Sequence, residues 1–401
     1  MNSEIFDGSV TSPKGFRADG LHCGLKDEKP DLALIVSDTP AAAAALFTTS
    51  SLAAAPVVLC KKQIDSGVAQ AILINSGNAN ACTGEQGMQD ARQMIQWTAK
   101  ALHLVPDTIL IASTGVIGHY LPMGIIRNGI ARITSSLAIN GGERAAEAIM
   151  TTDTRPKHRA ITFDLQGVPV SIGAIAKGSG MIQPNMATMI CIVTTDIAIK
   201  AHLLKNALKR VVNGTLNALT IDGEMSTNDC FLALANGQSG APKIESKNAD
   251  YETFEKALHQ LLLEMTLLLA RDGEGATKVI TITVREASSE QDAKKAARAI
   301  ANSMLVKTAL YGQDPNWGRI VSAVGSTGIR IDPNGFEIKI AGINVARDGC
   351  AIEYDEKKMQ HALAETELSI DISLNCGSFT SQVYTCDLTH EYITINAEYH
   401  T

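Results

Sequence analysis

The sequence predicts an α/β protein in which sheets and helices form layers. Three observations support this prediction. Short apolar runs alternate with segments of helical period up to about residue 150, long amphipathic helices follow residue 196, and β-branched, alternating runs dominate after residue 335. Such alternation is typical of helices packed against a sheet. The 401 residues are enough for two domains or one large α/β unit.

The first half of the chain alternates between expected strands and expected helices. We expect strands at four apolar runs: DLALIVSD (31–38), PVVLC (56–60), AILINS (71–76) and TILIAS (108–113). Apolar residues recur at helical spacing in GEQGMQDARQMIQWTAKALHL (84–104) and in the shorter INGGERAAEAIM (139–150). These segments predict helices beside the sheet.

The second half begins with helices and ends with strands. We expect helices over IAIKAHLLKNALKRVVNGTLNAL (197–219), YETFEKALHQLLLEMTLLLARDG (251–273) and SSEQDAKKAARAIANSM (288–304), the last opened by a capping box of Ser288 and Gln291. Strands are expected at FEIKIAGINVA (336–346), LSIDISL (368–374), SQVYTCDL (381–388) and EYITINAEY (391–399). The chain is therefore predicted to end on a strand.

Composition excludes two classes of partner. The chain is 45% hydrophobic and 19% charged, as in ordinary globular proteins, and its formal charge of −7 has the wrong sign for gripping phosphate backbones. Nucleic acid is not an expected partner. The segment LLLEMTLLLA (261–270) is strongly apolar, but it contains Glu264 and is shorter than the roughly 20 residues of a membrane helix.

The cysteines and the first residues bear on the cellular compartment. Eight cysteines are scattered without a CxxC pair or histidines at ligand spacing, which predicts reduced thiols and no metal site. The start, MNSEIFDGSV, lacks a basic stretch followed by an apolar one, so no secretory signal is expected. A cytoplasmic location follows as the expectation.

The segment AKGSGMIQPNMATMICIVTTD (176–196) places Thr188 where a glycine-rich turn becomes an apolar strand. A lone threonine entering a strand is usually only a suitable β-branched residue. If the bond after Ala187 breaks, however, Thr188 gains a free α-amine beside its hydroxyl. That amine has an ordinary pKa of about 8 and can take the hydroxyl proton. Gly178, Gly180 and Pro184 are typical of tight turns, and a tight turn would strain the bond to be cut.

Two further segments carry candidate partners for such a nucleophile. In ILIASTGVIG (109–118) an apolar strand runs into Thr114 and Gly115, whose backbone N–H groups are candidates for an oxyanion hole. The other interpretation is an ordinary glycine at the end of a strand. Lys177 could hold a substrate carboxylate or be a solvated surface lysine. In DGEGATK (272–278), Glu274 lies between glycines, but the spacing of a nucleotide phosphate loop is missing.

Together with matches along almost the entire chain, these residues resemble the ornithine acetyltransferases, also called arginine-biosynthesis bifunctional glutamate N-acetyltransferases. The self-cleaving segment of that family is similar to KGSGMIQPNMATMICIVTTD. Ordered likenesses extend over GFRADGLHCGLK, PDLALIVSD, INSGNANACTG, STGVIG, MTTDTRPK, LVKTALYGQDPNWGRI and TCDLTHEYITINAEYHT. So many ordered matches make an inert Thr188 a poor explanation.

The resemblance implies a precursor that cuts itself between Ala187 and Thr188 into an α chain, 1–187, and a β chain, 188–401. The two chains would stay intertwined, with a soft domain boundary, and commonly assemble as an α2β2 heterotetramer. The implied fold is a layered α/β sandwich similar to the N-terminal nucleophile hydrolases and to a small group of self-processing aminopeptidases.

The resemblance also implies the activity. Thr188 would take the acetyl group of N2-acetyl-L-ornithine and pass it to L-glutamate in a ping-pong reaction of L-arginine biosynthesis. Matching positions assign Thr188 as the nucleophile, Thr114 and Gly115 as the oxyanion hole, and Thr154, Lys177, Thr188, Glu274, Asn396 and Thr401 as substrate contacts. No bound cofactor is implied. Bifunctional members also use acetyl-CoA as a co-substrate, and no residue decides this point.

Other interpretations stay open from sequence alone. An aminopeptidase or amidohydrolase would use the same nucleophile with water as acceptor, and a binding or assembly protein would keep the fold uncut. The chain departs from the family pattern at Met225, Ser378 and Phe379. The segment TNDC (227–230) supports the site or caps a helix through Asn228 or Asp229.

Overall fold

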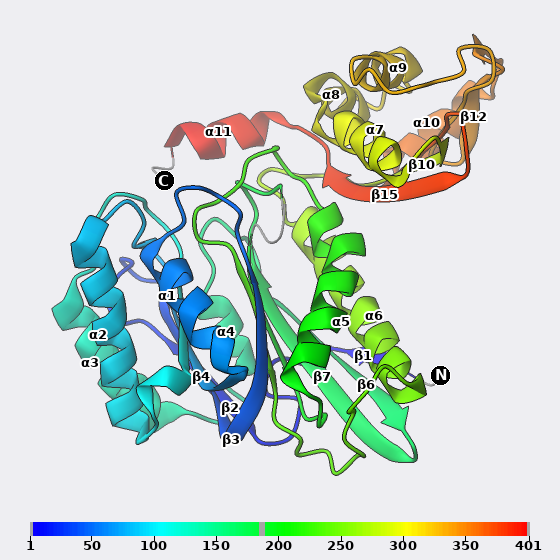
Figure 1. Cartoon of the computed structure of the whole chain (residues 1–401). Coiled ribbons are helices and arrows are strands. Elements are labelled where there is room, and N and C mark those ends of the chain that lie inside the picture. Colours follow the sequence, from blue (N-terminus) through cyan, green and yellow to red (C-terminus); the bar gives the residue numbers. More distant parts are fainter. Residues whose placement is uncertain (1–2, 184–188, 399–401) are drawn as a thin grey trace.

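The computed structural model describes residues 3–183 and 189–398, and it confirms a layered α/β architecture (Figure 1). Within the described residues a nine-stranded sheet has the order β1-β6-β7-β8-β9-β3-β4-β5, and β2 pairs with β3 outside this path. Its strands are β1 (Ser3–Phe6), β2 (Phe16–Leu21), β3 (Leu32–Phe47), β4 (Val68–Asn75), β5 (Ile109–Ser113), β6 (Lys157–Leu165), β7 (Val168–Lys177), β8 (Ile190–Thr195) and β9 (Cys230–Ala235).

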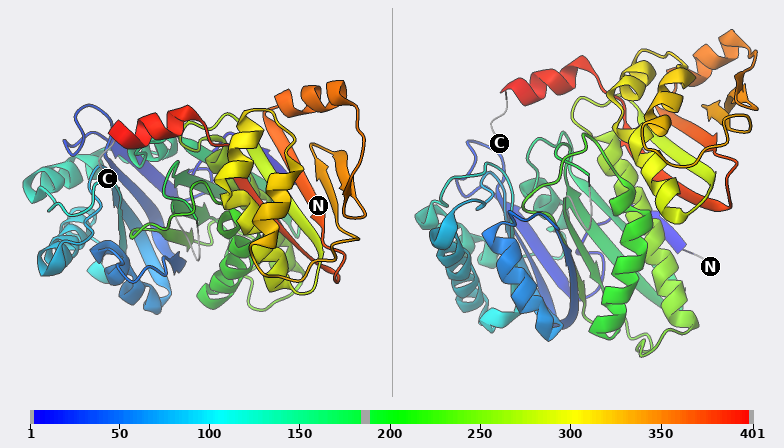
Figure 2. Two further views of the ribbon diagram at one scale, coloured as in Figure 1. Left: turned by 90° about the horizontal axis from the view of Figure 1, so that it is seen from above. Right: turned by 45° about the horizontal axis from the view of Figure 1, so that its top comes forward.

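Helices cover both faces of this large sheet. One core packs the sheet against α5 (Ala201–Gly214) and α6 (Ala249–Arg271). The other core packs it against α1 (Ala55–Gln63), α2 (Gly84–Leu102), α3 (Met123–Ser136) and α4 (Gly142–Ala148). Figure 2 shows the two helix groups on either side of the strands. Short 3₁₀ turns lie at Ile64–Ser66, Pro106–Thr108 and Leu216–Ala218.

Burial on both faces explains why β8 reads as an unbroken apolar run. Ile190 and Ile192 belong to the core with α1 to α4, whereas Cys191 and Val193 belong to the core with α5 and α6. Successive side chains of a strand point to opposite faces. A strand covered on both sides therefore needs apolar residues at every position, not at every second one.

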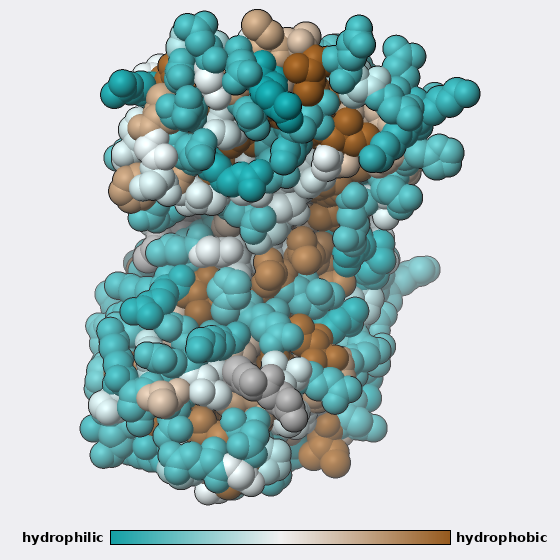
Figure 3. Space-filling model, turned by 90° about the vertical axis from the view of Figure 1, so that its right-hand side faces the viewer, coloured by the Kyte–Doolittle hydropathy of each residue, from teal (hydrophilic) through white to brown (hydrophobic). Residues whose placement is uncertain are grey.

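A smaller unit with its own core follows α6. Its sheet has the order β13-β12-β11-β14-β10-β15. The strands are β10 (Val279–Ala287), β11 (Glu337–Ile340), β12 (Ile343–Arg347), β13 (Cys350–Ala351), β14 (Glu367–Ser373) and β15 (Phe379–Cys386). The helices are α7 (Glu290–Asn302), α8 (Met304–Tyr311), α9 (Trp317–Gly325) and α10 (Glu356–Ala364). Seen from the side, the two units meet at a narrower waist, and most of this face is hydrophilic (Figure 3).

The predicted C-terminal strand is wrong, because residues 390–398 form a helix, α11 (His390–Glu398). The Thr389 hydroxyl accepts a hydrogen bond from the Glu391 N–H at 3.2 Å, which caps the first turn. None of the residues of α11 is buried, and Ile393 is 66% exposed. The alternating Ile and Thr residues therefore have no apolar layer to face. The helix extends from the smaller unit across one end of the large sheet (Figures 1 and 2).

Two local predictions also need correction. The run PVVLC is not a strand but lies in helix α1, with Pro56 in the first turn, where its missing N–H costs nothing. Five apolar residues are too few to distinguish a strand from a buried helix turn. Helix α7 is capped by Ser289, which accepts from the Asp292 N–H at 3.1 Å, one residue after the expected Ser288.

The predicted division into 1–187 and 188–401 falls inside the large sheet. Strands β7 and β8 are antiparallel neighbours, and Lys177 pairs with Ile190. The chain between them is thus a connection at one end of the sheet. Packing divides the molecule elsewhere, within β10, because Val279 belongs to a core of the large sheet and Ile280 to the core of the smaller unit. In the described part of the chain, we find no helix that is both long and apolar enough for a membrane span.

Candidate active site

The Thr114–Gly115 turn is fixed against a neighbouring loop by backbone contacts. The Thr114 N–H donates to the Asn75 carbonyl at 3.0 Å, and the Val116 N–H donates to the Gly77 carbonyl at 3.3 Å. Gly115 has φ of +127°, and a Cβ there would lie 2.4 Å from the carbonyl carbon of Gly77. Only glycine allows this approach.

Asn228, just before strand β9, holds the same turn in place. Its buried side chain donates through Nδ2 to the carbonyl of Ser113 at 2.8 Å and to that of Ala79 at 2.5 Å. Asn228 precedes strand β9, so the helix cap considered for TNDC is excluded. The asparagine instead ties the end of β5 to the start of β9.

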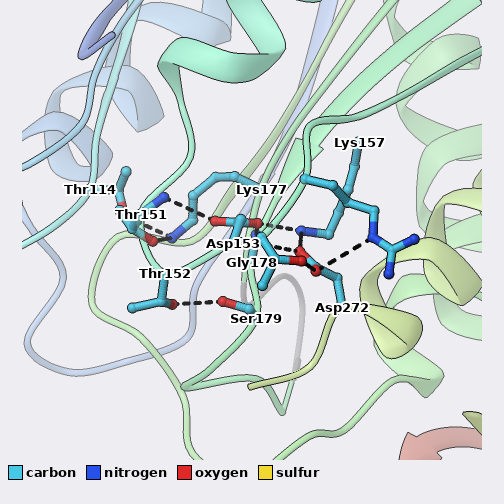
Figure 4. Close-up of polar contacts among 11 residues, drawn as sticks. Thr114, Thr151, Thr152, Asp153, Lys157, Lys177, Gly178, Ser179 and Asp272 are labelled. Atoms are coloured by element: carbon cyan, nitrogen blue, oxygen red, sulfur yellow. Dashed lines mark hydrogen bonds and ion pairs between the residues drawn. The ribbon is translucent and has the colours of Figure 1, made fainter. Parts of the chain in front are cut away.

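Lys177, the last residue of β7, reaches this turn with its side chain. Its Nζ lies 3.0 Å from the Thr114 hydroxyl and 3.0 Å from the Thr151 hydroxyl (Figure 4). Burial lowers the pKa of Lys177, while the carboxylates of Asp153 and Asp229 oppose this shift. A cation is thus held beside the candidate oxyanion hole.

Glu274 and Asn396 meet although they lie far apart in the sequence. Nδ2 of Asn396, on α11, donates to Glu274 Oε2 at 2.7 Å. The Glu274 N–H donates to the Ser179 carbonyl at 2.9 Å. A Cβ on Gly180 would lie 2.3 Å from Glu274 Oε2, so this glycine makes room for the carboxylate.

A cavity of about 170 Å³ brings these groups together. The predicted site residues that line it are Thr114, Gly115, Lys177, Glu274 and Asn396. Its described lining contains one basic residue, Lys177, and four acidic residues: Asp222, Glu224, Asp229 and Glu274. The cavity therefore offers separate places for an ammonium group and a carboxylate.

The structure does not place every predicted residue at the cavity. Ala187, Thr188 and Thr401 lie outside the described residues. Met189, which follows Thr188 in the sequence, lines the cavity. Thr154 is exposed and does not line it. Its backbone N–H and its hydroxyl both donate to Asp272. Thr151 and Thr152, from the same MTTDTRPK segment, do line it.

Sequence reasoning missed Asp222 and Glu224 in the segment DGEMSTND (222–229), whereas TNDC at its end was considered as a support of the site. Asp222 holds the turn after β7, because its carboxylate accepts from the Met181 N–H at 2.6 Å and the Ile182 N–H at 2.9 Å. Burial raises the pKa of Tyr392, on α11, to about 12, and the neighbouring acidic side chains add to this shift. The sequence did contain a signal for this part of the site, namely three acidic residues within one glycine-containing loop.

Behind the cavity, Lys157 forms a buried ion network. Its Nζ lies 2.5 Å from Asp153 Oδ1 and 2.5 Å from Asp272 Oδ2, and all three side chains are at most 1% exposed (Figure 4). Asp153 Oδ1 also accepts from the Gly178 N–H at 2.7 Å. Burial acts to raise the pKa of Asp153, but Lys157, Lys177 and hydrogen bonds outweigh it and hold the pKa well below the usual range. The network joins residues on both sides of the predicted cut.

We expect Asp272→Asn to lower the free energy of unfolding by about 3 kcal/mol, because Lys157 would keep only one of its two buried carboxylates. Chemical denaturation measures the loss. Glu367→Gln is the matched control, since it removes the largely exposed ion pair of Glu367 with Arg271. That change should cost about 1 kcal/mol or less. Equal losses in the two variants would show that the buried network adds no particular stability.

The chain has close relatives among known proteins. The ArgJ family profile matches residues 17–401. The arginine biosynthesis bifunctional protein ArgJ of Symbiobacterium thermophilum is 45% identical over 401 residues, covering 99% of this chain and 100% of that protein. The Bacillus anthracis protein of the same name is 44% identical over 400 residues, covering 100% of this chain and 98% of its own length.

A solved structure is also similar. The crystal structure of ornithine acetyltransferase from Mycobacterium tuberculosis, complexed with ornithine, is 36% identical with a TM-score of 0.44, and the match covers 46% of this chain and 100% of that chain. The match of the family profile to nearly the whole chain and the full-length relatives lead to one conclusion. This chain belongs to the ArgJ family.

Proposed function

We propose that this chain is an acetyltransferase of arginine biosynthesis that moves an acetyl group from N2-acetyl-L-ornithine to L-glutamate through Thr188. The similarity to bifunctional ArgJ proteins over the full length carries this proposal. It also disfavours the alternative of an aminopeptidase or amidohydrolase. The cavity adds chemical support, since it combines a rigid Thr114–Gly115 turn, one cation and several carboxylates.

Self-cleavage would create the nucleophile without dismantling the fold. A cut between Ala187 and Thr188 falls in the connection between β7 and β8, whose mutual hydrogen bonds keep both fragments in one sheet. The freed α-amine of Thr188, with an ordinary pKa of about 8, then takes the hydroxyl proton. Thr188 attacks the acetyl carbonyl, and the Gly115 N–H stabilises the oxyanion together with the Thr114 hydroxyl, because the Thr114 N–H already donates to the Asn75 carbonyl.

The charges of the cavity suit amino-acid substrates. Lys177 is the one basic residue among the described lining residues, so its ammonium group can pair with a substrate α-carboxylate. Glu274, held by Asn396, can pair with an ammonium group such as the side-chain amine of ornithine. Both the donor and the acceptor carry a carboxylate, so one cation serves both halves of a ping-pong reaction.

Three finer points belong to the same proposal. The bifunctional relatives suggest acetyl-CoA as a second acetyl donor for this chain, and no bound cofactor takes part. The α and β fragments assemble as an α2β2 heterotetramer. A cytoplasmic location stays a prediction.

Thr188→Ala should abolish both self-cleavage and acetyl transfer, because it removes the hydroxyl that performs each step. Thr188→Ser should still cut and transfer, since it keeps the hydroxyl. Intact mass of the denatured protein reveals the fragments, and formation of N-acetylglutamate from N2-acetyl-L-ornithine reveals transfer. An uncut Thr188→Ala protein with full transfer activity would contradict the mechanism.

Gly115→Ala should lower kcat by about 10²- to 10³-fold, the cost of losing an oxyanion donor, because the new Cβ collides with the backbone of Gly77. Gly124→Ala is the control. A Cβ on Gly124, in helix α3, meets no atom within 4 Å. Steady-state transfer to glutamate measures both variants, and a full-rate Gly115→Ala enzyme would remove this turn from the oxyanion hole.

A further inference from the structure

Asp229 carries a buried carboxyl group that the mechanism above does not use. The residue is 3% exposed and lines the cavity. Ser226 forms hydrogen bonds with the carboxyl group, but Oδ2 has no hydrogen-bond partner among the described residues. Buried polar atoms without a partner are uncommon and costly. An unpartnered oxygen at a cavity wall therefore indicates that its partner arrives with a ligand.

Backbone contacts fix the position of Asp229 at the wall of the cavity. The residue precedes β9, and the next N–H, that of Cys230, donates to the Met189 carbonyl at 3.0 Å. The carbonyl of Asp229 accepts from the Thr48 N–H at 3.0 Å. Asp229 therefore lies beside the start of β8, and Met189, which precedes this strand, directly follows Thr188 in the sequence.

The charged and titratable groups around the same cavity come from several elements. Lys177 ends β7, Glu274 follows α6, Tyr392 lies on α11, and Asp222 and Glu224 share the loop of Asp229. Burial raises the pKa of Asp229 well above its usual value, and the ammonium group of Lys177 opposes this shift. The resting carboxyl group thus holds a proton more readily than an exposed aspartate does.

We propose that Asp229 exchanges the proton of the substrate amines, giving one to the departing amine of the donor and taking one from the incoming ammonium of the acceptor. This inference rests on the acetyl transfer through Thr188 proposed above. It adds a proton-transfer residue that contacts the reacting nitrogen through Oδ2. The α-amine of Thr188 keeps its separate task of handling the hydroxyl proton.

The protons balance over one complete reaction. In the first half, the Thr188 oxygen bonds to the acetyl carbon, the C–N bond to ornithine breaks, and the leaving nitrogen receives the hydroxyl proton through the α-amine. The neutral amine then takes the Asp229 proton and leaves as an ammonium ion. In the second half, glutamate enters as an ammonium ion and returns one proton to Asp229. Its neutral amine attacks the ester, and its second proton restores the Thr188 hydroxyl.

The experiment separates proton transfer from structural support by changing the acceptor. We would load the enzyme with acetyl from p-nitrophenyl acetate, whose leaving group needs no proton, and follow loss of the acetyl group from the 188–401 fragment by mass. The acceptor is either glutamate, which arrives as an ammonium ion, or hydroxylamine, whose amine is already neutral at the assay pH.

We expect Asp229→Asn to slow acetyl loss to glutamate by about 10²-fold or more, the usual contribution of a positioned acid or base, and to affect hydroxylamine far less. Asp229→Glu should regain part of the glutamate rate, because it restores a carboxyl group. Asp196→Asn is the matched control. Asp196 is another buried aspartate with a raised pKa, at the opposite end of β8, and its change should leave the ratio of the two rates unaltered.

Equal slowing with both acceptors in Asp229→Asn would overturn the inference, because that pattern indicates structural damage. If N2-acetyl-L-ornithine leaves no acetyl group on the unaltered enzyme, the proposed function itself fails, which is a distinguishable result.

If the Asp229→Asn protein does not cleave itself, the pH dependence of the unaltered enzyme gives the decisive measurement. Its rate with glutamate should level off as pH rises, whereas a rate that follows the neutral fraction of free glutamate would overturn the role of Asp229.

Discussion

The antiparallel pairing of β7 with β8 is the constraint from which the rest of the site follows. It brings Lys177, at the end of one strand, opposite Ile190, at the start of the next. The parallel neighbour β9 then places Asp229 beside the same strand end, since Ile190 pairs with Cys230. Hydrogen bonds spread along these strands hold both sides of the connection, so the chain can be cut there while the cavity keeps its walls.

The polar network behind the cavity extends this arrangement. Lys157 contacts a carboxylate from the first part of the chain, Asp153, and one from the second part, Asp272. Asp153 also receives the N–H of Gly178, where the connection begins. Buried charges are expensive unless they are paired, so the network disfavours any arrangement that separates the two parts. The proposed cleavage would remove one covalent bond but leave these noncovalent constraints in place.

Local sequence patterns predicted the elements that bury a periodic face. DLALIVSD, AILINS and TILIAS lie in or overlap β3, β4 and β5. The long amphipathic segments contain α2, α5 and α7 and overlap α6. The pattern failed at PVVLC, where five residues do not define a period, and at EYITINAEY, where β-branched residues form an uncovered helix. Propensity alone cannot reveal that no sheet edge is available to a segment.

The candidate site was predictable only where residues match a known family. Thr114, Gly115, Lys177, Glu274 and Asn396 were expected and line one cavity. The roles of Asn228 and Asp229 depend on contacts with residues more than a hundred positions away in the sequence, such as the Asn228 bond to Ser113. No pattern within a short window contains that information, because only the order of strands in the sheet brings those residues together.

Helix α11 connects the cavity to the smaller unit. The helix continues from β15 of the smaller unit, yet it supplies Tyr392 and Asn396 to a cavity otherwise built on the large sheet. The start of the helix is held by a hydrogen bond, because the Thr389 hydroxyl donates to the Gly275 carbonyl at 2.7 Å, next to Glu274. Any rotation of the smaller unit would therefore move α11 relative to the contact at Thr389. Asn396, near the other end of the helix, would then shift in the cavity.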